Sequence, residues 1–196
     1  MKRTFAILLS FCFLYAGEFI FNGKFEDTLN HWNTYAHGET YTITTDKIYE
    51  EDPDSEVYVG RLDKRETAIY QTCYIPDLDL NFSFKAKLYA KSYDTLHPHP
   101  AISSIILSYL DVDENIQGET HIFRYAESLY WYPSPVLHLI EISDTNWFNY
   151  TLNIADELSN LPGVNPIDIK NYELLFIPAL MDVDQGMLRR RSSLMI

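Results

Sequence analysis

Hydrophobic and polar positions alternate along much of this chain, and the alternation is clearest over residues 80–89. A period of two with one polar face predicts an antiparallel strand that packs one side on a core and exposes the other to solvent. Residues 147–154 repeat the pattern. The apolar positions, which we expect to share the buried faces of these two strands, are Leu80, Phe82, Phe84, Ala86, Leu88, Phe148, Tyr150, Leu152 and Ile154.

Shorter runs of the same kind predict further strands, and only residues 155–160 suggest a single helical turn. We expect the runs at 57–62 and 68–75 to pair across the polar turn between them. The remaining predicted strands lie at residues 19–21, 41–44, 102–111, 119–125, 136–142 and 172–180. A series of short strands with almost no helical period predicts an all-β fold in which two antiparallel sheets form a sandwich.

The composition limits the classes of molecule that this protein can bind. The length of 196 residues suits one domain with a sizeable core. The formal net charge of -13 argues against nucleic acid and anionic lipid surfaces, because both attract cationic proteins; neutral polymers and cations remain compatible with it. Cys73, alone in a strand pattern with no histidine beside it, is predicted to be a small buried residue rather than a nucleophile.

The first 17 residues have the order of a secretory signal peptide. Lys2 and Arg3 provide the charged start, residues 5–15 are apolar, and Ala16 offers a small residue for cleavage. The apolar run is too short for an easy transmembrane span, and the alternative is a buried N-terminal strand. We therefore expect an exported protein, secreted, periplasmic or at the cell surface, with no membrane span after cleavage.

Residues 22–32 carry the pattern N-G-x-F-E-x-x-L-x-x-W. The Asn-Gly pair predicts a turn, and the large rings of Phe25 and Trp32 are expected to anchor this loop on the core. The pattern resembles the start of carbohydrate-binding modules of the galactose-binding-like β-sandwich fold, and residues 71–76 are similar to a second segment of that family. The resemblance implies a jelly-roll domain over residues 18–186 that binds carbohydrate without catalysis.

The resemblance also implies a structural calcium ion, with Glu26 in the position of a ligand. The alternative for Glu26 is a surface residue that caps the turn. A second family ligand, an aspartate of the last strand, has no counterpart, because residues 187–196 form an atypical basic tail. This tail is either a partner-binding segment or the product of a shifted reading frame. We favour the latter, since the neighbouring frame can encode the missing Phe-Asp-Asp strand.

An aromatic cluster of Tyr125, Tyr130, Trp131 and Tyr132 is the candidate ligand-binding site. Flat rings stack on the apolar C–H faces of sugars, while neighbouring polar side chains bind the hydroxyls. Side chains of consecutive strand residues point to opposite faces, so at least one ring of residues 130–132 is expected to be exposed. Packing at the rim of the domain is the alternative role for these rings.

Other motifs lack the spacing that their chemistry needs. His97 and His99 are separated by one proline and, with His121, do not make a zinc site. Residues 111–115 are acidic, but their spacing favours a hairpin turn over a calcium-binding loop. No two carboxylates are marked out for glycoside hydrolysis, so we expect a binding domain rather than an enzyme. A glycoside hydrolase is the further alternative, because the separation of its two carboxylates is spatial and not sequential.

These observations predict an exported, non-catalytic domain that is similar to carbohydrate-binding modules and has a polysaccharide or glycan as its partner. The alternative is a structural or adhesive domain at the cell surface or outside the cell, with no small-molecule ligand, because one fold serves many functions. Sugar binding would separate the two hypotheses.

Overall fold

The computed structural model describes residues 19–45, 56–62, 65–92, 100–127 and 131–180, with side chains as far as residue 173. The predicted signal peptide and the basic tail lie outside these ranges. The described residues are mostly β-strand, which confirms the all-β class. Among them, no helix has the length and apolar character needed to cross a membrane.

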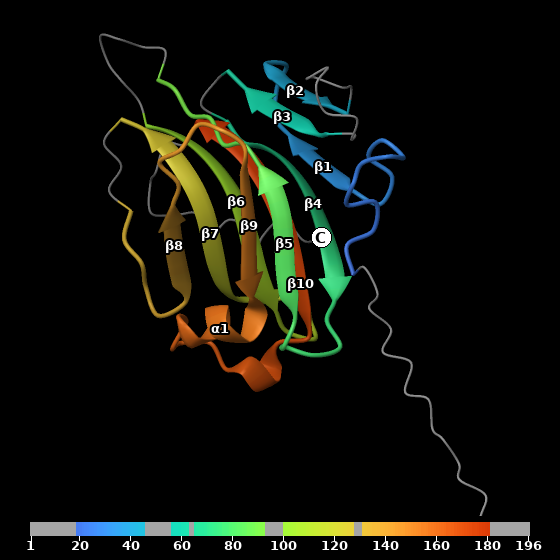
Figure 1. Cartoon of the computed structure of the whole chain (residues 1–196), viewed down its shortest axis with the longest axis vertical. Coiled ribbons are helices and arrows are strands. Elements are labelled where there is room, and N and C mark those ends of the chain that lie inside the picture. The colour runs from blue at the N-terminus through green and yellow to red at the C-terminus, as the bar shows by residue number, and fades with distance from the viewer. Residues whose placement is uncertain (1–18, 46–55, 63–64, 93–99, 128–130, 181–196) are drawn as a thin grey trace, which may run out of the picture.

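Six strands form the larger sheet, in the order β1-β4-β10-β6-β7-β8 (Figure 1). These strands are β1 (Asn33–Ala36), β4 (Thr67–Tyr74), β6 (Ala101–Leu110), β7 (Ile116–Ala126), β8 (Leu137–Glu141) and β10 (Asn171–Leu180). All neighbours are antiparallel except β7 and β8, which run parallel, so the prediction of purely antiparallel sheets is wrong at this edge. The chain re-enters the sheet beside the start of β7, where the N–H of Glu119 donates to the carbonyl of Val136, and this fixes the direction of β8.

Two antiparallel strand pairs complete the fold. β5 (Asn81–Ala86) pairs with β9 (Phe148–Asn153), and Figure 1 shows this pair in front of the larger sheet. β2 (Tyr41–Thr44) pairs with β3 (Tyr58–Arg61) at one end of the molecule. The described strands are therefore arranged in layers, with the β5–β9 pair packed on one face of the six-stranded sheet.

Two details of the predicted strand series are wrong. The runs at 57–62 and 68–75 do not pair, because β3 pairs with β2 while β4 lies between β1 and β10. Residues 19–21, predicted as a strand, form a bend and the start of a turn. β1 was not predicted, since its four residues show no hydrophobic alternation.

The main core lies between the β5–β9 pair and the facing side of the larger sheet, called the inner face from here on. Phe82 of β5 and Leu152 of β9 are buried there together with Ile105 and Ile122 of the sheet. The other apolar positions of β5 and β9 are half-buried, and the positions between them are mostly exposed. This confirms the predicted alternation.

The helix α1 (Ile154–Ser159) follows β9 directly and closes one end of the core. The side-chain oxygen of Asn153 caps it by accepting from two backbone N–H groups of the first turn, and Leu158 is buried against the core. The predicted helical turn is thereby confirmed. A short 3-10 segment, η1 (Pro166–Asp168), lies between this helix and β10.

The loop of residues 22–32 packs on the core as predicted. Phe25 and Trp32 expose only 9% and 7% of their surfaces, and their rings lie 5.2 Å apart. The indole Nε1 of Trp32 donates to the backbone carbonyl of Asn22 at 3.1 Å. Asn22 has a φ of 51° and donates through Nδ2 to three backbone carbonyl groups of the same loop. Two buried rings and one asparagine amide therefore hold the loop in place.

Gln71 of β4 joins this loop to the larger sheet. Its Oε1 accepts from the backbone N–H of Phe21 at 2.7 Å. Its Nε2 donates to the carbonyls of Phe21 and His31 at 3.0 and 2.9 Å. Gln71 is buried, so each of these hydrogen bonds replaces one that water would otherwise make. The side-chain amide thus makes the kind of hydrogen bonds with the backbone of the N-terminal segment that a neighbouring strand would make.

We expect Trp32→Ala to lower the free energy of unfolding by about 3–5 kcal/mol, because it empties a buried aromatic site and removes the hydrogen bond to Asn22. Urea denaturation monitored by circular dichroism measures the change. Trp147→Ala is the matched control, since Trp147 is 38% exposed and should contribute less than about 1 kcal/mol. Equal losses for the two variants would contradict the role of Trp32 as a core anchor.

Candidate functional site

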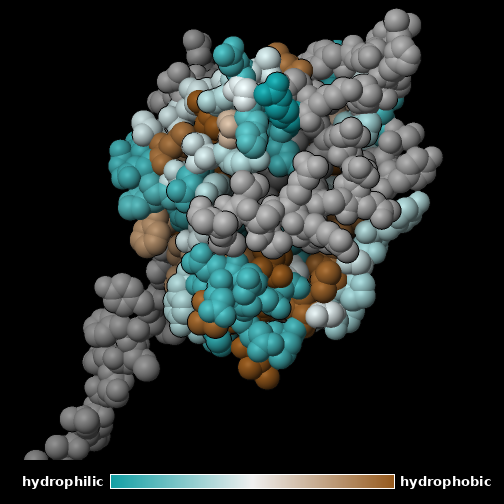
Figure 2. All heavy atoms as spheres, turned by 180° about the vertical axis from the view of Figure 1, so that it is seen from behind, coloured by the Kyte–Doolittle hydropathy of each residue, from teal (hydrophilic) through white to brown (hydrophobic). Residues whose placement is uncertain are grey.

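The larger sheet has a second, outer face, which is turned away from the β5–β9 pair and carries its own apolar cluster. Figure 2 views the molecule from the side opposite to the view of Figure 1. The buried members of the cluster are Ala68, Ile102, Ile106 and Phe123. The centre of the sheet is therefore covered on both faces, and every residue of β6 is buried.

Phe123 brings together two of the predicted ligand-binding residues, Tyr125 and Trp131, on the outer face. The ring of Tyr125 stacks with that of Phe123 at 6.0 Å, and Trp131 meets Phe123 edge-on at 5.1 Å. Tyr125 and Trp131 are half-buried, whereas Tyr132 is 72% exposed. Tyr130 lies outside the described residues. Of the two consecutive rings that the structure describes, one packs on the sheet and the other faces solvent.

A row of buried polar side chains lies beside these rings. Ser108 Oγ donates to Glu119 Oε1 at 2.8 Å, and Glu119 Oε2 lies 3.0 Å from Nε2 of His121. The imidazole of His121 meets the indole of Trp131 edge-on at 5.0 Å. All three members of this Ser108–Glu119–His121 row are buried. The row is thus a continuous hydrogen-bonded chain that ends against the aromatic group.

Two polar atoms on the same face have no hydrogen-bond partner among the described residues. They are Nδ1 of His121 and Oγ of Ser104, both buried. In the β6–β7 register His121 lies opposite Ile106, and Ser104 is the next outer-face residue of β6. A buried polar group without a partner costs about 1–3 kcal/mol, so such atoms indicate a water molecule or a ligand.

The contact with Glu119 determines what His121 can bind. When Glu119 is ionised it only accepts hydrogen bonds, so the proton of a neutral imidazole belongs on Nε2. Nδ1 is then an acceptor that requires a donor. The hydroxyl of Ser108 donates to Glu119 and not to His121, which differs from a nucleophilic serine activated by a histidine base. This arrangement suits recognition of a polar group better than acyl transfer.

No model of a known protein family matches the chain, and no curated protein matches it. The functional assignment therefore depends on the geometry of the outer face. Sequence reasoning missed the polar row, although one signal was present: Glu119 and His121 are two positions apart in a predicted strand, which places both on one face. The partner Ser108 comes from the neighbouring strand, and only the register of the sheet reveals it.

A second polar network lies on the inner face. Glu157 of α1 accepts a hydrogen bond from Thr120 at 3.1 Å and lies 2.7 Å from Nδ1 of His138. Tyr109 and Thr120 are joined at 3.1 Å. Burial raises the pKa of the Tyr109 hydroxyl, with the charge of Glu157 adding to the rise, so this hydroxyl stays protonated. The network fastens α1 to β7 and β8, and we assign it a structural role.

Glu26, the predicted calcium ligand, lies in the N-terminal loop. Glu26 is exposed, and the carbonyl groups of its loop accept from Asn22. Within the part of the chain that the structure describes, no three His, Cys, Asp or Glu side chains are close enough together to hold a metal. His97 and His99 lie outside that part. The calcium ion at Glu26 stays a prediction.

Residues 111–115 form the predicted hairpin turn. Oδ1 of Asp111 accepts from the backbone N–H groups of Asp113 and Asn115, and its Oδ2 accepts from Gln117. The backbone N–H of Asn115 makes the largest contribution to lowering the pKa of Asp111. This carboxylate therefore already serves as the cap of the turn.

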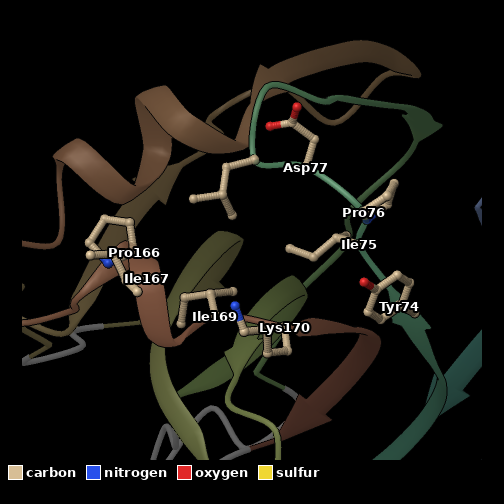
Figure 3. Close-up of a pocket in the computed structure, with 9 residues that line it drawn as sticks. Tyr74, Ile75, Pro76, Asp77, Pro166, Ile167, Ile169 and Lys170 are labelled. Atoms are coloured by element: carbon tan, nitrogen blue, oxygen red, sulfur yellow. The ribbon is translucent and has the colours of Figure 1, made fainter.

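A pocket of about 300 Å³ lies between the β4–β5 connection and η1 (Figure 3). Ile75 and Ile169 point into it, and the carboxylate of Asp77 points away from them. Tyr74 and Ile167 form its exposed margin. Tyr74, Asp77 and Lys170 line it beside the apolar residues, so its wall is partly polar, and we assign it no ligand.

Cys73 has the buried position that the sequence predicted. It is 4% exposed, and burial raises the pKa of its thiol to about 11, while a hydrogen bond with Tyr172 acts in the opposite direction. The thiol also lies 3.3 Å from Oε1 of Gln71. A buried, protonated thiol is a poor nucleophile.

We expect Cys73 to resist thiol reagents at pH 8 in the folded protein, because raising a pKa from 9.0 to about 11 lowers the thiolate population about a hundredfold, and burial blocks access as well. The other cysteine, Cys12, lies in the predicted signal peptide and is replaced by serine where the leader is retained. The reaction with Ellman's reagent, followed by absorbance, then measures Cys73 alone. The same protein in urea should react within minutes. A native rate close to the rate in urea would show that Cys73 is accessible.

Proposed function

We propose that this chain is an exported, non-catalytic carbohydrate-binding domain of the jelly-roll type. The observation that carries the proposal is the juxtaposition, on the outer face, of the aromatic group Tyr125–Phe123–Trp131 with the Ser108–Glu119–His121 row. The layered all-β fold and the buried rings of Phe25 and Trp32 support it, because both agree with the N-terminal motif.

The two halves of the site suit the two kinds of surface that a sugar presents. Half-buried rings at Tyr125 and Trp131 can lie against apolar C–H faces, and Tyr132 adds an exposed ring next in sequence. The polar row places hydrogen-bonding atoms within contact of the Trp131 ring, through His121. Pockets that combine a few placed polar groups with aromatic walls are typical small-molecule sites.

Two parts of the proposal, export and a bound calcium ion, are predictions made from the sequence. The leader predicts a secreted, periplasmic or cell-surface location, where polysaccharides and glycans are accessible partners. A calcium ion held by Glu26 would stabilise the N-terminal loop rather than contact the sugar, because that loop packs on the inner core. Sugar binding and calcium binding are therefore separable properties of the domain.

We expect Trp131→Ala to weaken binding by about tenfold or more to any polysaccharide that the unmodified protein binds in a pull-down, because central aromatic residues dominate such contacts. Glycan arrays and pull-down on insoluble polysaccharides identify the polymer, and calorimetry on a soluble fragment measures the change. Tyr132→Ala is the second variant: its ring is exposed, so its removal leaves the fold intact.

Trp147→Ala serves as the control, since Trp147 lies under Lys85 of β5, at 5.5 Å, away from the outer face. Equal affinity of Trp131→Ala, Tyr132→Ala and the unmodified protein would remove the aromatic group from the site. Absence of any sugar binding, together with a stable oligomer, would instead favour the structural or adhesive alternative.

A further inference from the structure

The outer face holds two unsatisfied polar atoms that come from neighbouring strands. Nδ1 of His121 and Oγ of Ser104 are buried, and neither has a hydrogen-bond partner among the described residues. They belong to consecutive cross-strand pairs on the same face, His121 with Ile106 and Phe123 with Ser104. The half-buried Trp131 lies against His121, which places the accessible part of the cluster next to this buried pair.

The orientation of the imidazole is constrained from two directions. Glu119 holds Nε2 at 3.0 Å, and Glu119 is itself held by the hydroxyl of Ser108. The edge-on contact with Trp131, at an interplanar angle of 89°, restricts rotation of the ring. In the neutral tautomer that carries its proton on Nε2, His121 presents Nδ1 as an acceptor of fixed orientation. The hydroxyl of Ser104 can rotate, so it either donates or accepts.

We propose that His121 Nδ1 and Ser104 Oγ recognise one hydroxyl group of a neutral saccharide, which donates to Nδ1 and accepts from Oγ. This inference rests on the proposed function and adds the chemistry of the ligand. A carboxylate or sulfate cannot supply the donor that Nδ1 requires, and the buried carboxylate of Glu119 repels it. The group bound at this point is therefore a hydroxyl, and the net charge of -13 disfavours polymers that carry acidic groups elsewhere.

The test compares Ser104→Ala with Ser103→Ala. Ser103 is the adjacent buried serine of β6, and strand alternation turns its side chain to the inner face, so it is a matched control. The probes are a panel of neutral and uronate-containing soluble polysaccharides, then an oligosaccharide of the retained polymer and its monodeoxy analogues. Calorimetry should show about tenfold weaker binding for Ser104→Ala, which is the loss expected for one hydrogen bond, and no change for Ser103→Ala.

The deoxy analogues identify the hydroxyl. One of them should bind the unmodified protein about tenfold more weakly, yet bind Ser104→Ala with little further loss, because the same contact is already missing. Binding of a neutral polymer with equal affinity by Ser104→Ala and the unmodified protein would overturn the inference while leaving the proposed function intact. Preference for uronate-containing polymers would overturn it as well.

Nitrogen NMR of the His121 ring gives a readout that does not require a polymer. We expect a proton on Nε2 and a non-protonated Nδ1, and a shift of the Nδ1 resonance when methyl glycosides are added at millimolar concentration. If no polysaccharide binds but this shift occurs and disappears in Ser104→Ala, the hydroxyl site stands and the polymer-binding function fails. A proton on Nδ1, or no response to any glycoside, would overturn the inference.

Discussion

Burial of both faces of β6 is the constraint on which the rest of this structure depends. A strand covered on two sides cannot leave its polar side chains to water, so each of them needs a partner within the protein or a bound molecule. Ser108 meets this requirement through Glu119, whereas Ser104 has no partner among the described residues. The candidate site therefore arises where the packing of the central strand leaves hydrogen bonding incomplete.

The same two strands carry a polar network on each face. Ser108 and Glu119 face outward and continue to His121, while the adjacent residues Tyr109 and Thr120 face inward and continue to Glu157. A shift of β7 by one residue against β6 would exchange these faces and break both networks. The register of β6 and β7 is thus specified by hydrogen bonding as well as by hydrophobic burial. A rigid register also keeps the imidazole of the outer row in a fixed orientation.

The strands that sequence reasoning predicted best are those with one exposed face. β5 and β9 alternate cleanly because Phe82 and Leu152 face the core while the positions between them face solvent. β6 is covered on both faces, so its sequence shows no alternation that would reveal its pairing, and β4 is covered on both faces only over its first half. The wrong pairing of β3 with β4 follows from this, because proximity in sequence was the only remaining guide.

The candidate site was predictable in part. Tyr125 and Trp131 were recognisable as aromatic residues, since ring-rich segments are uncommon and their chemistry is general. Ser104 and Ser108 were not, because a serine in a strand becomes a binding group only through its neighbours across the sheet. The importance of His121 depends on its burial against Trp131, a contact that no spacing within the chain encodes.

The amide of Gln71 has a consequence for how the chain reaches this structure. It holds Phe21 across a sequence separation of 50 residues, so a chain synthesised from its N-terminus carries the rings of Phe25 and Trp32 for some time before their docking partner exists. Nascent chains with unprotected aromatic surface are prone to premature association. The period during which these two rings lack their docking partner ends once β4 has been synthesised.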